Sequence, residues 1–174
     1  PLSYFLDDYA VSYTYSARYL LNTFAANEAE SSKRFMGVAP VRFASSMNLP
    51  SLIGSDESLT RLQSYFGNGK SLVAGNASKE KFLQQFNQYS IIQLYTHASA
   101  GGDNAEPVIF FADSALLLSD LIYGARPFTR LIVLSACETA KGKLYQGEGV
   151  FSFNREFASM GIPASVSNLW QVDN

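Results

Sequence analysis

The chain has 174 residues, 47% of them hydrophobic and 14% aromatic, and a formal net charge of -2. This composition suits one packed domain, excludes a disordered chain and, with few scattered Lys and Arg residues, excludes a basic nucleic-acid-binding face. No apolar run approaches the roughly 18 residues of a membrane span. The single Cys and single His exclude an internal disulfide and a soft-ligand zinc site. We therefore expect one domain over 1–174, without metal or cofactor, in a reducing cytoplasmic setting.

The first half of the chain alternates helical and strand patterns. Apolar spacing and turn residues predict, in chain order, a helix over 16–29, a strand over 38–44, a turn-rich stretch over 48–55, a helix over 56–66, a strand over 71–74 and a helix over 78–89. Ser78 is expected to cap the last of these helices.

The second half contains two continuous apolar runs that are typical of strands buried on both faces. They cover 91–96 and 131–134, and runs of this kind favour a parallel sheet. The remaining patterns predict a hairpin of 108–111 with 116–118, a helix over 119–123, a helix over 149–160 ended by a glycine, and a strand over 164–170. Strands alternating with helices indicate an α/β layer fold. Because the sequence stops directly after a strand, we expect a fragment of a longer chain.

His97 and Cys137 each follow one of the two apolar runs. In parallel sheets the residues beyond the carboxyl ends of the strands line the ligand site. If the two strands are neighbours, their ends lie about 5 Å apart, so the two side chains can meet. A thiol needs a nearby base to become a nucleophilic thiolate, and an imidazole is a suitable base near neutral pH. On placement alone, an inert buried Cys and a surface His remain the more common interpretation.

Three segments near these residues form a recognisable pattern. Residues 134–140 read LSACETA, 147–150 read GEGV, and 167–173 read SNLWQVD. The THA stretch at 96–98, Leu49-Pro50 and the segment 75–83 agree with the same pattern. Together they resemble the CHAT family, which comprises caspase- and separase-related domains often attached to tetratricopeptide repeats in bacteria. The resemblance covers about 2–173, nearly the whole chain.

The resemblance implies a caspase-hemoglobinase-like three-layer sandwich with a mainly parallel central sheet and helices on both faces. It also implies cysteine endopeptidase activity, with Cys137 as the nucleophile and His97 as general base and acid. A regulatory protein or a tetratricopeptide-repeat domain is the implied partner, and a protein or peptide is the implied substrate. Family members commonly have Gly after the His, where this chain has Ala98. The backbone N–H groups of Ala98 and Cys137 are the candidates that hold the oxyanion.

Five further residues are candidates for substrate binding because they lie close in sequence to the expected catalytic edge: Asp103, Glu106, Glu138, Trp170 and Asp173. A carboxylate there would favour a basic substrate residue, and an indole could form a pocket wall. Polar residues in loops are more often simply solvated.

Two other functions remain open at this stage. The domain could keep the fold as a catalytically silent protein-interaction module. It could also be a flavodoxin-like small-ligand domain that uses the same sheet edge, although the sequence lacks a phosphate-binding glycine pattern.

Overall fold

The computed structural model describes residues 8–9, 14, 21, 35–67, 69–99, 106–117, 119–122, 128–136, 144–145, 149–150 and 153–167. The helix expected at 16–29 lies, apart from Leu21, outside these residues.

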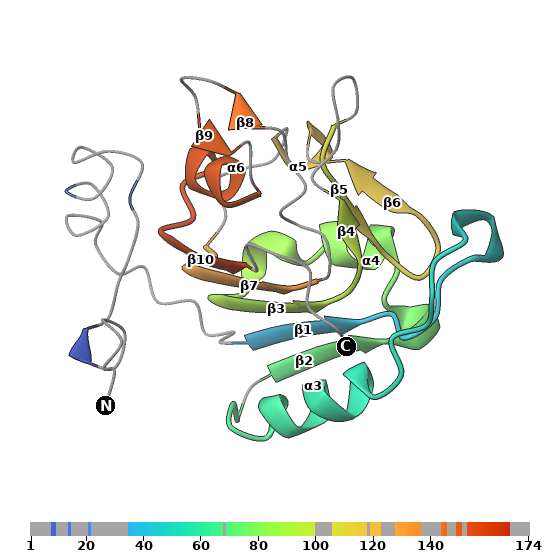
Figure 1. Cartoon of the computed structure of the whole chain (residues 1–174). Coiled ribbons are helices and arrows are strands. Elements are labelled where there is room, and N and C mark those ends of the chain that lie inside the picture. The colour runs from blue at the N-terminus through green and yellow to red at the C-terminus, as the bar shows by residue number, and fades with distance from the viewer. Residues whose placement is uncertain are drawn as a thin grey trace, which may run out of the picture.

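A five-stranded parallel sheet organises the described part of the chain (Figure 1). Its strands are β1 (Phe35–Ala39), β2 (Gly69–Val73), β3 (Ile91–Tyr95), β7 (Leu131–Ser135) and β10 (Ala164–Ser167). Their spatial order is β10-β7-β3-β1-β2, and every neighbouring pair is parallel. Parallel neighbours need crossover connections, and helices provide several of them here.

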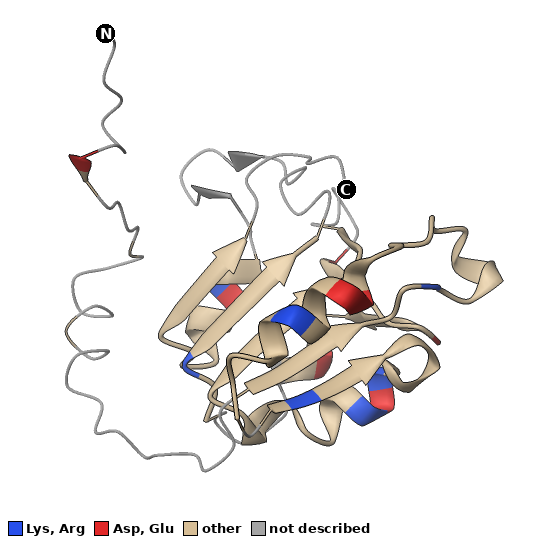
Figure 2. Ribbon diagram, turned by 90° about the horizontal axis from the view of Figure 1, so that it is seen from below, with Lys and Arg blue, Asp and Glu red and all other residues tan. Residues whose placement is uncertain are grey.

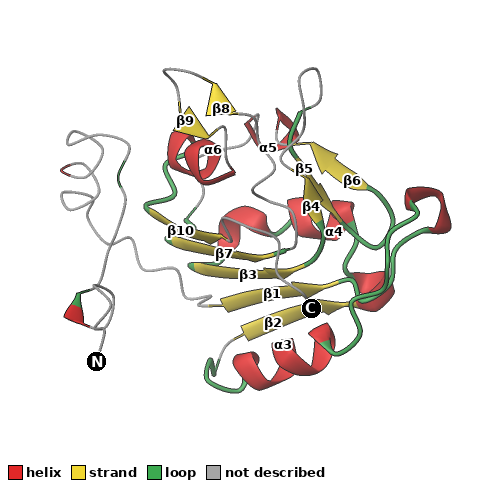
Figure 3. Cartoon of the chain, viewed as in Figure 1, coloured by secondary structure: helices red, strands yellow, loops and turns green. Residues whose placement is uncertain are grey.

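Helices lie on both faces of this sheet (Figure 3). The helix α3 (Ser55–Gln63) covers one face, and α4 (Lys79–Leu83), α5 (Ser119–Ile122) and α6 (Phe153–Ser159) lie on the other. The second face also carries an antiparallel sheet of β4 (Ala98–Ser99), β5 (Val108–Phe110) and β6 (Ala115–Leu117). A separate pair joins β8 (Leu144–Tyr145) to β9 (Gly149–Val150). The mixed α/β class and mainly parallel sheet expected from the sequence are confirmed.

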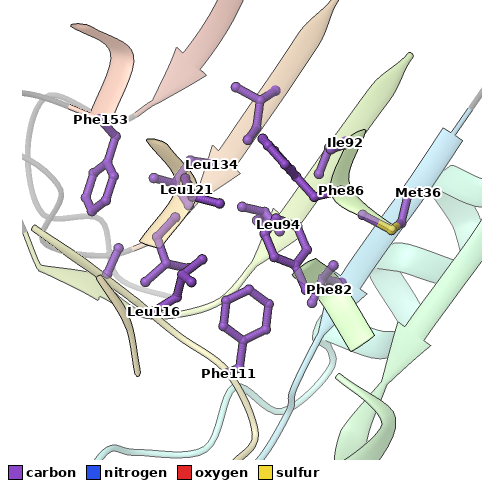
Figure 4. Packing of buried hydrophobic residues seen from close by; sticks show 14 of the residues in the cluster. Met36, Phe82, Phe86, Ile92, Leu94, Phe111, Leu116, Leu121, Leu134 and Phe153 are labelled. Atoms are coloured by element: carbon purple, nitrogen blue, oxygen red, sulfur yellow. The ribbon is translucent and has the colours of Figure 1, made fainter. Parts of the chain in front are cut away.

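Alternate residues of β1, β2 and β3 enter different cores. In β1, Met36 and Val38 join the main core, whereas Phe35 and Ala39 pack with Leu59 of α3 on the other face. In the main core, side chains from helices, strands and the hairpin point toward one another (Figure 4). The labelled members are Met36, Phe82, Phe86, Ile92, Leu94, Phe111, Leu116, Leu121, Leu134 and Phe153. Two-sided burial also explains the continuous apolar run before His97. In β7, by contrast, Leu131 and Val133 are only half-buried.

Several boundaries differ from the sequence-based expectations. The first strand ends at Ala39 rather than 44, because Pro40 lacks the N–H that a ladder requires and the chain then turns. The last described helix begins at Phe153 rather than 149, because Gly149 and Val150 pair with β8. The helix expected over 78–89 ends at Leu83, and a 3₁₀ turn over Phe86–Gln88 follows, because Gln85 leaves helical geometry at φ -124°.

Other expectations are confirmed. Ser78 caps α4, and its side chain accepts a bond from the Lys81 N–H at 3.4 Å. The hairpin expected around 112–115 is the antiparallel β5–β6 pair. Acidic and basic residues are interspersed over the described part of the chain (Figure 2).

Candidate functional site

The strands β3 and β7 are parallel neighbours whose last residues pair with each other. Tyr95 is the ladder partner of Ser135, and the Thr96 N–H donates to the Ser135 carbonyl at 3.3 Å. The two strands therefore end level at the carboxyl edge of the sheet. His97 follows β3 after one residue, Thr96, and the ladder shows that its strand neighbours the one before Cys137, a point that the sequence leaves open.

Two ladders fix the backbone on either side of His97. The β3–β7 ladder ends just before it, and β4 begins immediately after it at Ala98. The His97 carbonyl accepts a bond from the Phe110 N–H at 2.9 Å, and the Thr96 hydroxyl donates to the Phe110 carbonyl. The partly exposed imidazole thus projects from a rigid backbone at the sheet edge.

Within the described part of the chain, the imidazole has one hydrogen-bond partner. Its Nε2 atom lies 2.9 Å from the carbonyl oxygen of Pro50. A carbonyl oxygen can only accept, so Nε2 must carry the proton in this bond. In the neutral ring, Nδ1 is then the unprotonated nitrogen. The arrangement leaves Nδ1 as the atom that can take a proton from a reacting group.

Pro50 belongs to a loop, 40–54, that follows β1 and extends beyond the sheet on the right of Figure 1. The loop opens with a γ-turn, in which the Arg42 N–H donates to the Pro40 carbonyl at 2.6 Å around Val41 at φ 63°. A β-branched residue rarely adopts positive φ, and such strain is characteristic of functional loops. The Val41 carbonyl accepts from the Leu52 N–H at 2.8 Å, which closes the loop near Pro50.

The same loop places an aromatic ring against His97. The centroids of the Phe43 and His97 rings are 5.0 Å apart, and the ring planes are tilted by 48°. Next to Phe43, the Ala44 N–H donates to the Ala112 carbonyl at 2.9 Å and ties the loop to the β5–β6 turn. The imidazole is therefore held by a carbonyl and a ring from one loop.

The comparison with protein families agrees with this architecture. The model of the CHAT domain family matches residues 2–174. The chain belongs to the CHAT domain family. This family is related to cysteine peptidases of the caspase type, and the parallel five-stranded sheet with helices on both faces agrees with that fold. No curated protein matches the chain.

In this CHAT domain, Ala98 is buried and pairs with Ile109 of β5. The Phe110 N–H donates to the His97 carbonyl, so these two residues form a hydrogen-bonded pair. Bonded and non-bonded pairs alternate along an antiparallel ladder, so the next pair, Ala98 with Ile109, is a non-bonded one. The Ala98 N–H therefore points away from β5 and is not used by that ladder. Its predicted role toward an oxyanion stays a prediction.

Glu106 makes a local contact in the CHAT domain. One carboxylate oxygen accepts from the Ser119 N–H, and the other accepts from the Ser119 hydroxyl at 2.9 Å. The carboxylate is thereby engaged at the start of α5. A substrate-binding role for Glu106 stays a prediction that competes with this structural one.

The other predicted site residues lie outside the described residues: Asp103, Cys137, Glu138, Trp170 and Asp173. Among the described residues, no group of three or more His, Cys, Asp or Glu side chains could hold a metal ion. In the same part of the chain, no helix has the length and apolar character needed to cross a membrane.

Sequence reasoning missed two groups that contact His97. Pro50 acts through its backbone carbonyl, which carries no residue-specific signal, although Leu49-Pro50 fits the family pattern. Phe43 was expected within a strand, and only the early end of β1 shows that it belongs to the loop.

Proposed function

We propose that this CHAT domain is a cysteine endopeptidase in which Cys137 is the nucleophile and His97 is the general base and acid. The observation that carries this proposal is the bond between His97 Nε2 and the Pro50 carbonyl, at 2.9 Å. In that bond Nε2 is the donor, so Nδ1 is the nitrogen that can accept a proton at the carboxyl edge of the sheet.

Chain geometry supports the pairing of Cys137 with His97. Cys137 follows Ser135 by two residues, as His97 follows Tyr95, and Tyr95 and Ser135 are ladder partners. Neighbouring strands lie about 4.8 Å apart, and each residue adds at most about 3.6 Å of chain. A thiol two residues beyond Ser135 is thus within reach of the imidazole.

The chemistry runs in two halves. His97 Nδ1 takes the thiol proton, and the Cys137 thiolate attacks the carbonyl carbon of the scissile peptide bond. The oxyanion of the tetrahedral intermediate accepts hydrogen bonds from the backbone N–H groups of Ala98 and Cys137. His97 then gives its proton to the leaving amine, and an acyl-enzyme thioester remains. A water molecule, deprotonated by His97, attacks the thioester and releases the carboxylic acid and the thiol.

The substrate and its control belong to the same proposal. Asp103, Glu106, Glu138 and Asp173 are the candidate carboxylates for a basic substrate residue, and Trp170 is the candidate pocket wall. The proposed setting is the cytoplasm of a bacterium. Control comes from a regulatory partner or an attached tetratricopeptide-repeat domain, as the family relationship suggests.

Alkylation kinetics test the dyad, since Cys137 is the only cysteine of the chain. The protein is treated with iodoacetamide and with a lysyl chloromethyl ketone peptide, and intact mass gives the extent of reaction. We expect Cys137 to react faster in the folded protein than in urea, and His97→Ala to abolish this difference. Cys137→Ala gives the background.

Equal alkylation rates in the native protein and in His97→Ala would contradict an activated dyad. If Cys137→Ala also kept every cellular function of the full-length protein, the domain would be a non-catalytic interaction module. Faster labelling by the peptidyl reagent than by iodoacetamide, lost on addition of a competing peptide, would support a substrate groove beside Cys137.

A further inference from the structure

The proposed chemistry assigns no role to the aromatic ring that touches His97. The Phe43 ring centroid lies 5.0 Å from that of the imidazole, with the planes tilted by 48°. Phe43 is half-buried, so the ring is neither a core side chain nor a freely solvated one. The contact joins the loop 40–54 to the residue that would act as the base.

The backbone around Phe43 is fixed on both sides. Before it, the γ-turn bond from Arg42 to Pro40 and the bond from Leu52 to Val41 hold the start of the loop. After it, Ala44 donates to the Ala112 carbonyl at 2.9 Å. A ring presented from an anchored backbone is placed before any substrate arrives, which is the condition for preorganised catalysis.

The contact has a physical consequence for the imidazole. The ring of Phe43 and the carbonyl of Pro50 approach His97 from the same loop, so together they restrict rotation of the imidazole. Restricted rotation keeps Nε2 on the Pro50 carbonyl and Nδ1 available as the proton acceptor.

Other charged or titratable groups also lie on the elements around His97. Among the described residues they are Arg42 on the loop, Tyr95 on β3 and Glu106 ahead of β5, whose carboxylate bonds to Ser119. Arg42 is exposed and lies next to Phe43 in the chain.

We propose that Phe43 is a positioning residue that holds the His97 imidazole in its Pro50-bonded orientation, with Nδ1 placed to take the thiol proton of Cys137. This inference rests on the proposed function. It assigns part of the activation of the nucleophile to the loop after β1 rather than to the two dyad residues alone.

The test compares iodoacetamide alkylation of Cys137 at pH 7 in the native protein and in variants of Phe43, His97 and Phe66. We expect Phe43→Leu to react about two- to fivefold more slowly than the native protein, because the aromatic contact that orients the imidazole is lost. Phe43→Tyr keeps the aromatic face and should restore the rate. The control is Phe66→Leu, which removes another half-buried ring, stacked on Phe35 at 4.6 Å and held against α3. It should lower stability without changing the rate.

The outcomes separate this inference from the dyad itself. An unchanged rate in Phe43→Leu, together with a large loss in His97→Ala, would overturn the role of Phe43 and keep the proposed function. An unchanged rate in His97→Ala would overturn both. If Phe43→Leu unfolds, Phe43→Met is the non-aromatic variant that decides: a slower rate in folded Phe43→Met with a native rate in Phe43→Tyr supports the aromatic requirement. A native rate in Phe43→Met, or equal slowing in Phe43→Met and Phe43→Tyr, would contradict it.

Discussion

Tyr95 of β3 and Ser135 of β7 are ladder partners, and each is the last residue of its strand. His97 and Cys137 follow them at the same interval of two residues. Strands that run parallel and end level deliver the residues that follow them to the same edge of a sheet. This register is the link between the apolar runs of the sequence and the proposed chemistry.

The imidazole of His97 should be observed as the tautomer with its proton on Nε2. Pro50 offers a carbonyl at 2.9 Å, which can bond only to a protonated nitrogen. The tautomer can be read from two-bond proton–nitrogen NMR correlations at a pH where the ring is neutral. His97 is the only histidine, so its signals need no residue assignment. The protein in urea provides the unbonded reference. A proton found on Nδ1 in the folded protein would show that the Pro50 bond does not persist in solution.

Pattern reasoning worked where burial controls the sequence. The apolar runs before His97 and Cys137 predict the strands β3 and β7, whereas the adjacency of these strands, which the sequence leaves open, is shown only by the ladder between them. The hairpin at 112–115 was predictable from its turn residues. These features depend on local composition, which a single sequence displays.

Other features differ from the pattern that their residues favour. Val41 and Phe43 have β-favouring side chains, yet Pro40 ends the ladder and the γ-turn redirects the chain. Gly149 lies in the range predicted as helix, but it pairs with Tyr145. The contact of Pro50 with His97 spans 47 residues and uses a backbone atom, so no residue type signals it.

Loss of the ion pair between Lys79 and Asp120 should make the protein less stable above pH 4. The Lys79 ammonium donates to the Asp120 carboxylate at 2.6 Å, and with the Leu117 N–H it holds the pKa of that carboxyl below its ordinary value of 3.8. The unfolded state therefore takes up a proton first as pH falls. The stabilisation is present above about pH 4 and disappears as pH falls through the lower folded pKa.

The expected size is small, because the Asp120 side chain is 33% exposed and water screens the pair. We expect Asp120→Asn to lose about 0.5–1 kcal/mol in urea unfolding at pH 7, and less in high salt. Lys79→Met and the double variant complete a cycle that isolates the pair. A zero coupling energy at pH 7, or a coupling that grows as pH falls below 4, would refute this account.

Glu106 and Ser119 provide a test that separates a structural carboxylate from a substrate-binding one. Both oxygens of Glu106 are bonded to Ser119, so Glu106→Gln and Ser119→Ala should each cost about 1 kcal/mol of unfolding free energy. Labelling by a lysyl chloromethyl ketone peptide should then change little in either variant. Slower labelling in Glu106→Gln alone would instead assign the carboxylate to a basic substrate residue.

A methyl group added at Gly37 should destabilise the fold through its contact with α3. Gly37 lies in β1, an interior strand of the sheet, and a Cβ there would overlap Cδ1 of Leu59 and lie 2.9 Å from its Cγ. Overpacking of this kind in a core costs about 1–3 kcal/mol, which urea unfolding of Gly37→Ala would measure. Gly75→Ala is the matched control, because no atom lies within 4 Å of its added Cβ. Its unfolding free energy should change by less than about 0.5 kcal/mol.

Removal of the Leu59 side chain tests whether its contact with the added methyl group causes the loss of stability in Gly37→Ala. Leu59→Ala alone leaves a cavity and should cost about 2–5 kcal/mol, since Leu59 is fully buried. In Gly37→Ala with Leu59→Ala, the new methyl group occupies part of that cavity. The double variant should therefore lose less stability than the sum of the two single variants. Strictly additive losses would show that Gly37→Ala acts through the strand backbone and not through Leu59.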